Sequence, residues 1–372
     1  MKKNIIFIFC LILCGCITEF KPKNTDETDG ILVVEGIITD GESVITLSRS
    51  KGLSYEDNLF DLTPYHVTDA KVFIECDDGT RWGVVRQNSG EYTIATGKLN
   101  PERQYRLKIE MDETDGNQTK TYEYGSNYDY PIVTPKIDSV FWTKKEKGQP
   151  VNIHVATHPA DSMTHYYRWT YREDWVTIAV IYKRGLPSIC SKNNNSKELL
   201  LGTTERAAFG KLTEILSEIP PNNDRFMILY RMDVAQIAIS KRAFDYYSNV
   251  KKNSTQSGGI FAQIPSEIKG NISCTTDPSR PVIGYMDISS ASRNRLYIWR
   301  ADVYEDSNLQ LCMPVAYNYY MMQSGYVYVD GGYVMRQCAD CSATGGRSPK
   351  ELPDDWPYQY ENEELDKPWE EK

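Results

Sequence analysis

The sequence is poor in the residues and motifs that usually assign a function. Its 372 residues include four histidines, and they contain no Walker motif, no dinucleotide-binding glycine run and no G-x-S-x-G motif. Basic residues are outnumbered by acidic ones, 42 to 51, so the electrostatic footprint of a nucleic-acid-binding protein is missing. These absences argue against nucleotide-dependent enzymes, nucleophile-elbow hydrolases and proteins that bind nucleic acid.

Metal-binding patterns are equally scarce. His154 and His158 have the i, i+4 spacing of a zinc pair on a helix, but the alternating apolar residues around them predict a strand. On a strand the two imidazoles lie about 13 Å apart, too far for one metal ion. Carboxylates are abundant, yet no stretch singles out an acid–base pair. We therefore predict a protein that is not an enzyme, with no metal, no cofactor and no catalytic residues.

The start of the chain resembles the signal of a bacterial lipoprotein. Two lysines precede the apolar run Ile5 to Leu13, which is too short to span a bilayer. The run ends in Leu-Cys-Gly-Cys, the layout of a lipobox whose last cysteine, Cys16, takes the lipid. A lipid with several acyl chains anchors a protein stably to a membrane. We predict a signal peptide over residues 1–15, a lipidated tether over residues 16–30, and a mature chain in an oxidising space.

The other end of the chain is strongly acidic. Residues 351–372 hold nine acidic residues and two lysines, interleaved with tyrosines and tryptophans. Such a segment is either a solvated tail or an acidic-aromatic segment that docks on a partner, and the composition leaves both interpretations open.

Residues 31–130 predict an immunoglobulin-like β-sandwich. β-branched runs alternate with the turn dipeptides Asp40-Gly41, Asp78-Gly79 and Asp115-Gly116, and Asp-Gly between such runs is a strong hairpin signal. The spacing gives about seven short strands in roughly 95 residues, the rhythm of a sandwich. A polar-aromatic stretch, residues 51–69, interrupts this rhythm as a long loop.

Residues 136–350 predict a larger, β-rich second domain with one or two helices. Ser240 is suited to cap a helix near residues 241–252, whose apolar residues fall at helical spacing. A second short helix is predicted from Glu205 to Ile219, where two prolines follow. The fold class is therefore mainly β.

Aromatic residues are concentrated in a few segments. The chain has 26 tyrosines, and the densest segment, HYYRWTYREDW, begins at His165. Alternate aromatics on a strand either cover a buried sheet face or form a recognition surface with polar groups at its edge. The candidate recognition residues are Tyr166, Tyr167, Trp169, Tyr171 and Trp175.

Several motifs, taken in order, resemble one family. The lipobox is followed by LVVEGIITDG, IDSV, YYRW, the helix near residue 241, IGYM and finally C-x-D-C-x-x-x-G-G with PDDW after it. This order resembles the Bacteroidota lipoproteins grouped as domain of unknown function 4249, over roughly residues 16–356. In that family an aromatic residue usually precedes the final tryptophan, whereas this chain has Asp355.

The resemblance implies a location and partners. Family members are outer-membrane lipoproteins, typically encoded beside a TonB-dependent receptor, so we expect an accessory role in uptake that involves a ligand or that receptor. The anchored protein then faces either the periplasm or the cell surface, and a surface adhesin or structural envelope protein is the alternative function. A hydrolase with an unrecognised site is the third possibility.

The cysteines predict structural disulfides. Once the signal is removed and Cys16 is lipidated, Cys76 and five later cysteines remain, and thiols in an exported protein tend to pair. Cys76, on a predicted strand, is expected to be buried and free. Zinc or redox roles for Cys338-Ala-Asp-Cys341 lack a second close ligand pair or a helix at the motif. One of the five others then lacks a partner, and whether Cys338 and Cys341 bond each other stays open; the candidate disulfide cysteines are Cys190, Cys274, Cys312, Cys338 and Cys341.

Overall fold

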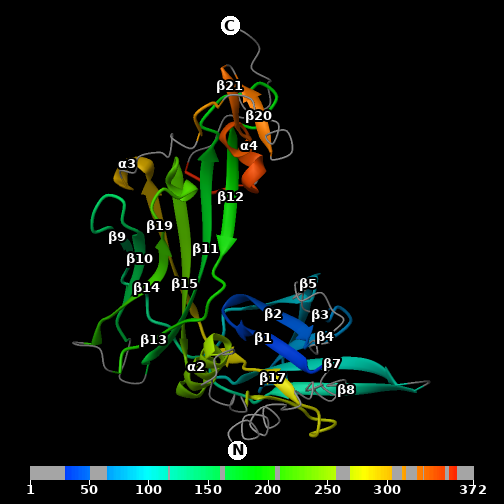
Figure 1. The fold of residues 1–372 in the computed structure, drawn as a ribbon. Helices are drawn as coiled ribbons and strands as arrows, with labels where there is room; N and C mark the ends of the chain where they lie inside the picture. The colour runs from blue at the N-terminus through cyan, green and yellow to red at the C-terminus, as the bar shows by residue number, and fades with distance from the viewer. Residues whose placement is uncertain are drawn as a thin grey trace, which may run out of the picture.

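The computed structural model describes residues 30–50, 65–115, 118–159, 164–205, 210–256, 269–303, 312–315, 325–329, 331–347 and 352–357. These residues are mainly β-structure, as predicted, and they form two β-sandwiches and a small C-terminal unit (Figure 1). The predicted signal peptide, Cys16, nearly all of the tether and most of the acidic tail lie outside the described residues. Among the described helices, none is both long and apolar enough to cross a bilayer.

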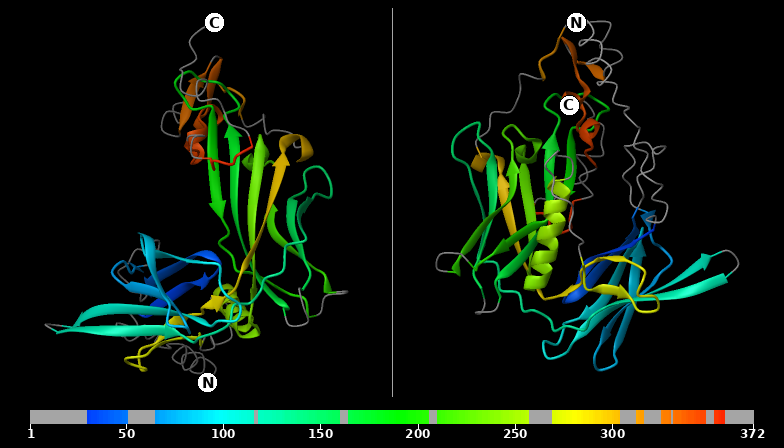
Figure 2. Two further views of the ribbon diagram at one scale, coloured as in Figure 1. Left: turned by 180° about the vertical axis from the view of Figure 1, so that it is seen from behind. Right: turned by 60° about the horizontal axis from the view of Figure 1, so that its bottom comes forward.

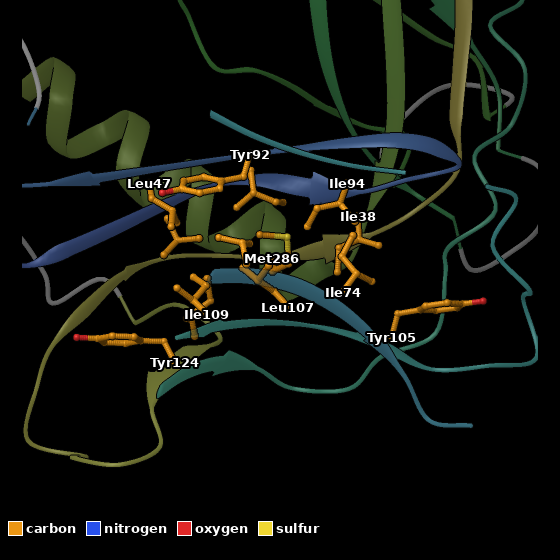
Figure 3. Close-up of a cluster of buried hydrophobic side chains, with 14 of the residues drawn as sticks. Ile38, Leu47, Ile74, Tyr92, Ile94, Tyr105, Leu107, Ile109, Tyr124 and Met286 are labelled. Atoms are coloured by element: carbon orange, nitrogen blue, oxygen red, sulfur yellow. The ribbon is translucent and has the colours of Figure 1, made fainter. Parts of the chain in front are cut away.

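The first sandwich contains the first eight strands. They are β1 (Leu32–Ile38), β2 (Gly41–Arg49), β3 (Tyr65–His66), β4 (Lys71–Cys76), β5 (Arg81–Asn88), β6 (Glu91–Gly97), β7 (Tyr105–Asp115) and β8 (Gln118–Ser126). One layer contains β6, β2 and β1, and the other contains β8, β7 and β4. β5 joins the layers, because its start pairs with β4 and the rest pairs with β6 after a register shift. Buried side chains from both layers, such as Leu47, Ile74 and Leu107, form one core (Figure 3).

Two tight turns of this sandwich are the ones that the sequence predicts. Asp40-Gly41 connects β1 to β2, and Asp78-Gly79 connects β4 to β5, both in antiparallel pairs. Gly41 has a φ of 82° and Gly79 a φ of 91°, a region that residues with a β-carbon avoid. β7 and β8 also pair antiparallel, although residues 116–117 of their turn lie outside the described residues.

Three short strands from much later in the chain complete the first sandwich. β17 (Val282–Gly284) and β18 (Asp287–Ile288) pair parallel with β1, while β16 (Ile272–Cys274) pairs antiparallel with β8. With the loop between them they add Ile272, Met286 and Ile288 to the core, and Figure 3 shows Met286 there. The predicted first domain, residues 31–130, omits these strands, since the short-range pattern of a sequence does not reveal a pairing partner 250 residues away.

The second sandwich packs a small sheet on a larger one. β9 (Ser139–Thr143), β10 (Val151–Thr157) and β14 (Leu212–Ile219) form the small sheet. The larger sheet has the order β12 (Ile189–Asn195), β11 (Tyr166–Ile178), β15 (Leu229–Ile239), β19 (Ala291–Trp299), with β13 (Leu200–Thr203) also beside β11. Ile153 of the small sheet and Trp169 and Tyr230 of the large sheet belong to the core between them.

The predicted helix from Glu205 to Ile219 is wrong. Residues 206–209 lie outside the described part of the chain, and β14 occupies Leu212–Ile219. β14 pairs antiparallel with β10, and Leu212, Leu216 and Ile219 are buried on it. A register shift at Ile153 and His154 absorbs the spacing that resembles a helix, so the tertiary pairing overrides the local pattern.

One helix lies at the junction of the two sandwiches. α2 (Lys241–Gln256) matches the helix predicted near residues 241–252, and the hydroxyl of Ser240 accepts a 3.1 Å hydrogen bond from the Ala243 amide as its N-terminal cap. Tyr246 and Tyr247 of α2 pack in a cluster that includes Ile37 from β1 and Tyr285 from the loop after β17. The helix therefore contacts both sandwiches (Figure 2).

The C-terminal unit covers the far end of the larger sheet. It contains the hairpin β20 (Tyr326–Val329) and β21 (Gly332–Met335), then α4 (Arg336–Ala339) and the 3-10 turn η6 (Cys341–Thr344) (Figure 1). Two disulfides hold it, Cys190–Cys341 to β12 and Cys312–Cys338 within the unit. Cys338 and Cys341 therefore do not bond each other.

The aspartate and the second glycine of the C-x-D-C-x-x-x-G-G segment help to position the segment beside the Cys190–Cys341 disulfide. Asp340 is buried and its carboxylate caps η6 by accepting a 3.0 Å hydrogen bond from the Ser342 amide. A β-carbon on Gly346 would lie 2.6 Å from the Cβ of Cys190, so only glycine fits beside the disulfide. Cys274 is buried and free in β16, as is Cys76 in β4, so Cys274 is the candidate cysteine without a partner.

Candidate binding cleft between the two sandwiches

One face of the larger sheet of the second sandwich is unusually rich in arginine. Side chains alternate along a strand, so the tyrosines and tryptophans of β11 that enter the core place Arg168, Thr170 and Arg172 on the opposite face. The register of β15 and β19 adds further arginines to that face. We call this set the arginine face: Arg168, Arg172, Arg231, Arg293 and Arg295.

The arginine face has a ladder of ion pairs at its upper end. Nε and Nη2 of Arg172 both donate to the carboxylate of Asp174, with Nη2 2.9 Å from Oδ1. Arg231 and Arg295 both bind Asp233, which is the cross-strand partner of Arg295 and lies two residues from Arg231 on β15. These pairs use fixed, planar guanidinium geometry, which suits carboxylates.

Asp355 closes this ladder from the C-terminal segment. Its carboxylate accepts a 2.7 Å hydrogen bond from Nη1 of Arg231 and a second bond from Arg295. Those two guanidiniums hold the pKa of Asp355 below its usual range. The neighbouring Trp356 is buried with Val176 and Leu229. The beginning of the acidic tail thus contacts the body of its own chain. The family resemblance leads one to expect an aromatic residue before the final tryptophan, and in this chain Asp355 occupies that position and binds the two arginines instead.

Two arginines lower on the face are less fully paired. Arg293 is exposed and has no ion pair among the described residues. The Nε of Arg168 is buried and lacks a hydrogen-bond partner among the described residues, while its guanidinium lies 4.8 Å from the ring centre of Tyr247. Both side chains therefore have donor capacity left for an anion.

These lower arginines line a cleft between the sandwiches. The cavity has a volume of about 1070 Å³, and one wall contains Arg168, Arg172, Arg293 and Arg295 with Asp233. The other wall comes from the first sandwich and includes Glu35 and Thr46 on its strands β1 and β2, and Glu91 on β6. The two walls thus have opposite charge, and a ligand between them would contact both domains.

The base of the junction contains a buried carboxyl group. Asp287 of β18 is 5% exposed, and its Oδ2 has no hydrogen-bond partner among the described residues. Burial raises the pKa of Asp287 to about 7, although the positive charge of Arg168 opposes the shift.

The predicted recognition surface of aromatic residues is wrong. Tyr167, Trp169 and Trp175 are buried because this side of β11 packs into the core of the second sandwich, and Tyr166, on the opposite side, is buried in the cluster that includes Tyr246 and Tyr247 of α2. Trp169 donates its indole hydrogen to Gln236 at 2.9 Å, a bond inside the protein. Only Tyr171, which is half-buried, is among the residues that line the cleft. The sequence showed that the side chains of this strand alternate between two faces, but it did not show which face is buried.

A second, smaller cavity lies beside the Cys190–Cys341 disulfide. Its volume is about 370 Å³, and it is lined by Trp175, Lys192, Arg225, Thr344 and their neighbours. Lys192 already binds Asp224 and Thr344 at 2.6 Å each. Lys192 thus links β12 both to η6, through Thr344, and to Asp224.

The described residues contain no group of three or more histidine, cysteine, aspartate or glutamate side chains that could hold a metal ion. His154 lies on β10, as expected, with its ring nitrogen 2.8 Å from Oγ1 of Thr143, while His158 binds Asp138. The two histidines thus have separate partners. The residues that sequence reasoning missed are the cleft arginines, whose signal was their period-two spacing at positions 168 and 172 and at 293 and 295.

Comparisons with known proteins identify a family and little else. The family model described as Domain of unknown function (DUF4249) matches residues 17–295. No curated protein matches the chain. Among solved structures, the two fibronectin type-III domain segment from chicken tenascin has 8% sequence identity and a TM-score of 0.17, covering 57% of this chain and 91% of that chain. A TM-score that low carries no argument for this protein.

Proposed function

The chain belongs to the family described as Domain of unknown function (DUF4249), and from this premise we propose that it is a lipid-anchored, non-catalytic accessory protein of the outer membrane. In this role it binds the ligand of a TonB-dependent receptor, or the receptor itself, during nutrient uptake. The lipobox at Cys16 supports the anchor, and the family resemblance supports the partner.

One observation carries the proposal: the cleft of about 1070 Å³ between the two sandwiches. Ligand sites occur preferentially at such domain interfaces. Its lower arginines have unused hydrogen-bond donors, which suit a carboxylate, a sulfate or a phosphate. The ligand of this cleft is therefore an anionic or acidic molecule that contacts both sandwiches.

The chemistry of the cleft favours binding over catalysis. Asp233 accepts hydrogen bonds from Arg231 and Arg295, and Asp355 accepts from the same two arginines. Those two guanidiniums hold the pKa of Asp355 below its usual range, so this carboxylate stays ionised and is a poor proton donor or base near neutral pH. Asp355, at the upper end of the arginine face, thus positions charge and does not move protons.

Co-purification tests the proposed role. The full-length protein, isolated from detergent-solubilised outer membrane at its native level of expression, is expected to carry a TonB-dependent receptor with it. An Arg293→Glu variant should retain the anchor but lose uptake of one nutrient. Arg103 lies on the first sandwich outside the cleft, so an Arg103→Glu variant should take up that nutrient as the parent does. Isolation of the protein without any such receptor would contradict the proposal.

A deletion strain separates this role from the adhesin alternative. If the protein serves uptake, the strain grows poorly on one nutrient and attaches to surfaces as the parent does. The reverse pattern, normal growth with poor attachment, would favour an adhesin.

A further inference from the structure

We infer that the arginine face binds a segment of this same chain: the acidic tail, residues 358–372, which would lie along the second-sandwich wall of the cleft and compete there with other anionic ligands. The inference concerns the cleft of the proposed function and adds regulation to it. Its test needs neither a receptor nor a nutrient, so either idea can fail without the other.

The first argument is the charge of the face. The arginine face has five guanidinium groups, and the carboxylates that pair with them are Asp174, Asp233 and Asp355. Two positive charges therefore exceed the negative ones on this face. The excess lies at the lower end, where Arg293 is exposed and Arg168 retains an unpaired Nε among the described residues.

The second argument is continuity with an observed contact. Asp355 already binds Arg231 and Arg295, and Trp356 is 5% exposed in a cluster with Val176, Leu229 and Leu352. The last described residues before the tail therefore lie beside the upper end of the arginine face. Each carboxylate that follows starts at high local concentration near the remaining arginines.

The third argument is the composition and reach of the tail. Residues 358–372 (YQYENEELDKPWEEK) contain six acidic residues and two lysines. Fifteen extended residues span about 50 Å, whereas Arg172 and Arg168 are separated by about 13 Å along β11. The tail is therefore long enough to reach the lower arginines. Tyrosine and tryptophan in the tail can also stack on guanidinium groups.

The opposite wall sets the orientation. Glu35 and Glu91 of the first sandwich face the same cavity and repel carboxylates. The acidic side chains of the tail thus turn to the second sandwich, and Lys367 is the tail residue suited to the glutamates. An extended peptide with this pattern complements both walls.

Photo-crosslinking of the full chain tests the inference. A benzophenone amino acid replaces Tyr360 or Trp369, the purified protein is irradiated, and the crosslinked peptides are identified by mass spectrometry. We expect crosslinks to residues 166–172, 233–239 and 291–299. The double variant Arg172→Glu and Arg293→Glu should lower their yield at least fivefold, and the matched control Arg103→Glu should leave it unchanged.

Changes in the tail give the same readout without altering the folded body. Replacement of Glu361, Glu363 and Glu364 by glutamine should lower the crosslink yield about as much as the Arg172→Glu, Arg293→Glu double variant does. Replacement of the same three glutamates by arginine, in a protein that also carries that double variant, should restore the yield. Such rescue would support pairing of opposite charges. Crosslinks elsewhere on the chain, crosslinks between isotopically distinct copies, or none at all would overturn the inference.

Discussion

Glu173 is the best example of how single residues hold this protein together. Glu173 is 1% exposed, and a carboxyl group buried this deeply needs hydrogen-bond or ion-pair partners. Arg225 and Asn194 donate to its Oε2 at 3.0 and 2.9 Å, and the phenol of Tyr230 donates to Oε1 at 2.6 Å. The network ties β11 to β12, β15 and the turn η3 (Asp224–Phe226).

Removal of that carboxylate should destabilise the second sandwich strongly. Glu173→Ala leaves Arg225 and the Tyr230 hydroxyl without their acceptor, and breaking a buried pair costs about 3–5 kcal/mol. Glu218→Ala, at an exposed position of β14, should cost under about 0.5 kcal/mol. Urea unfolding of both variants measures the difference, and equal midpoints would show that the network contributes nothing.

Asp287 should make stability depend on pH. Its folded-state pKa is about 7, above the ordinary value of 3.8, so the folded protein holds a proton that the unfolded chain releases. Stability from this group is complete below about pH 4 and is lost as the pH rises through 7. The charges that act on it are Arg168 of β11, which opposes the shift, and Asp129, which supports it.

Asp287→Asn isolates that effect. The variant should gain about 2–4 kcal/mol of unfolding free energy relative to the parent at pH 8. At pH 4.5 the gain should be far smaller, because the parent is then protonated as well. Denaturant unfolding at both pH values measures this, and a gain that does not vary with pH would contradict the raised pKa of Asp287.

At the scale of elements, close backbone approach fixes how β17 joins the first sandwich. A β-carbon on Gly284 would lie 2.4 Å from the carbonyl oxygen of Val34 on β1, whereas one on Gly83 of β5 would meet only the Phe73 ring at 3.9 Å. Only the first glycine is thus required by packing.

Two alanine variants therefore form a matched pair. Gly284→Ala should cost about 2–3 kcal/mol, because the parallel pairing with β1 must shift to make room. Gly83→Ala should be nearly neutral. Thermal unfolding followed by circular dichroism compares them, and the pairing of β17 with β1 would be in doubt if both melted at the parental temperature.

Elements with strong local signals were predictable, and those with tertiary constraints were not. The Asp-Gly hairpins and the Ser240-capped helix follow from preferences of a few adjacent residues. β14 was mistaken for a helix because apolar residues at 212, 216 and 219 have helical spacing, and only its pairing with β10, which includes a register shift, makes it a strand.

At the scale of the whole molecule, the chain order interlocks the two sandwiches. The chain leaves the first sandwich after β8, builds most of the second, and returns with β16, β17 and β18 before β19 completes the larger sheet. Neither sandwich is therefore a contiguous piece of sequence.

A fragment limited to residues 31–130 should consequently fail to fold. It lacks Ile272, Met286 and Ile288, which fill the core, and it exposes the edges of β1 and β8. We expect poor amide dispersion in its NMR spectrum and a tendency to aggregate. A cooperative thermal transition in the fragment would show that the returning strands are dispensable.

The sequence by itself determined the local facts: a mainly β chain, its tight turns, its main helix, and cysteines suited to disulfides. Each of these depends on neighbouring residues or on composition. Only the tertiary structure decided that Cys190 pairs with Cys341, that the aromatic side of β11 is the core, and that the arginine side lines a cleft. A period of two assigns side chains to opposite faces of a strand, but which face is buried depends on what packs there.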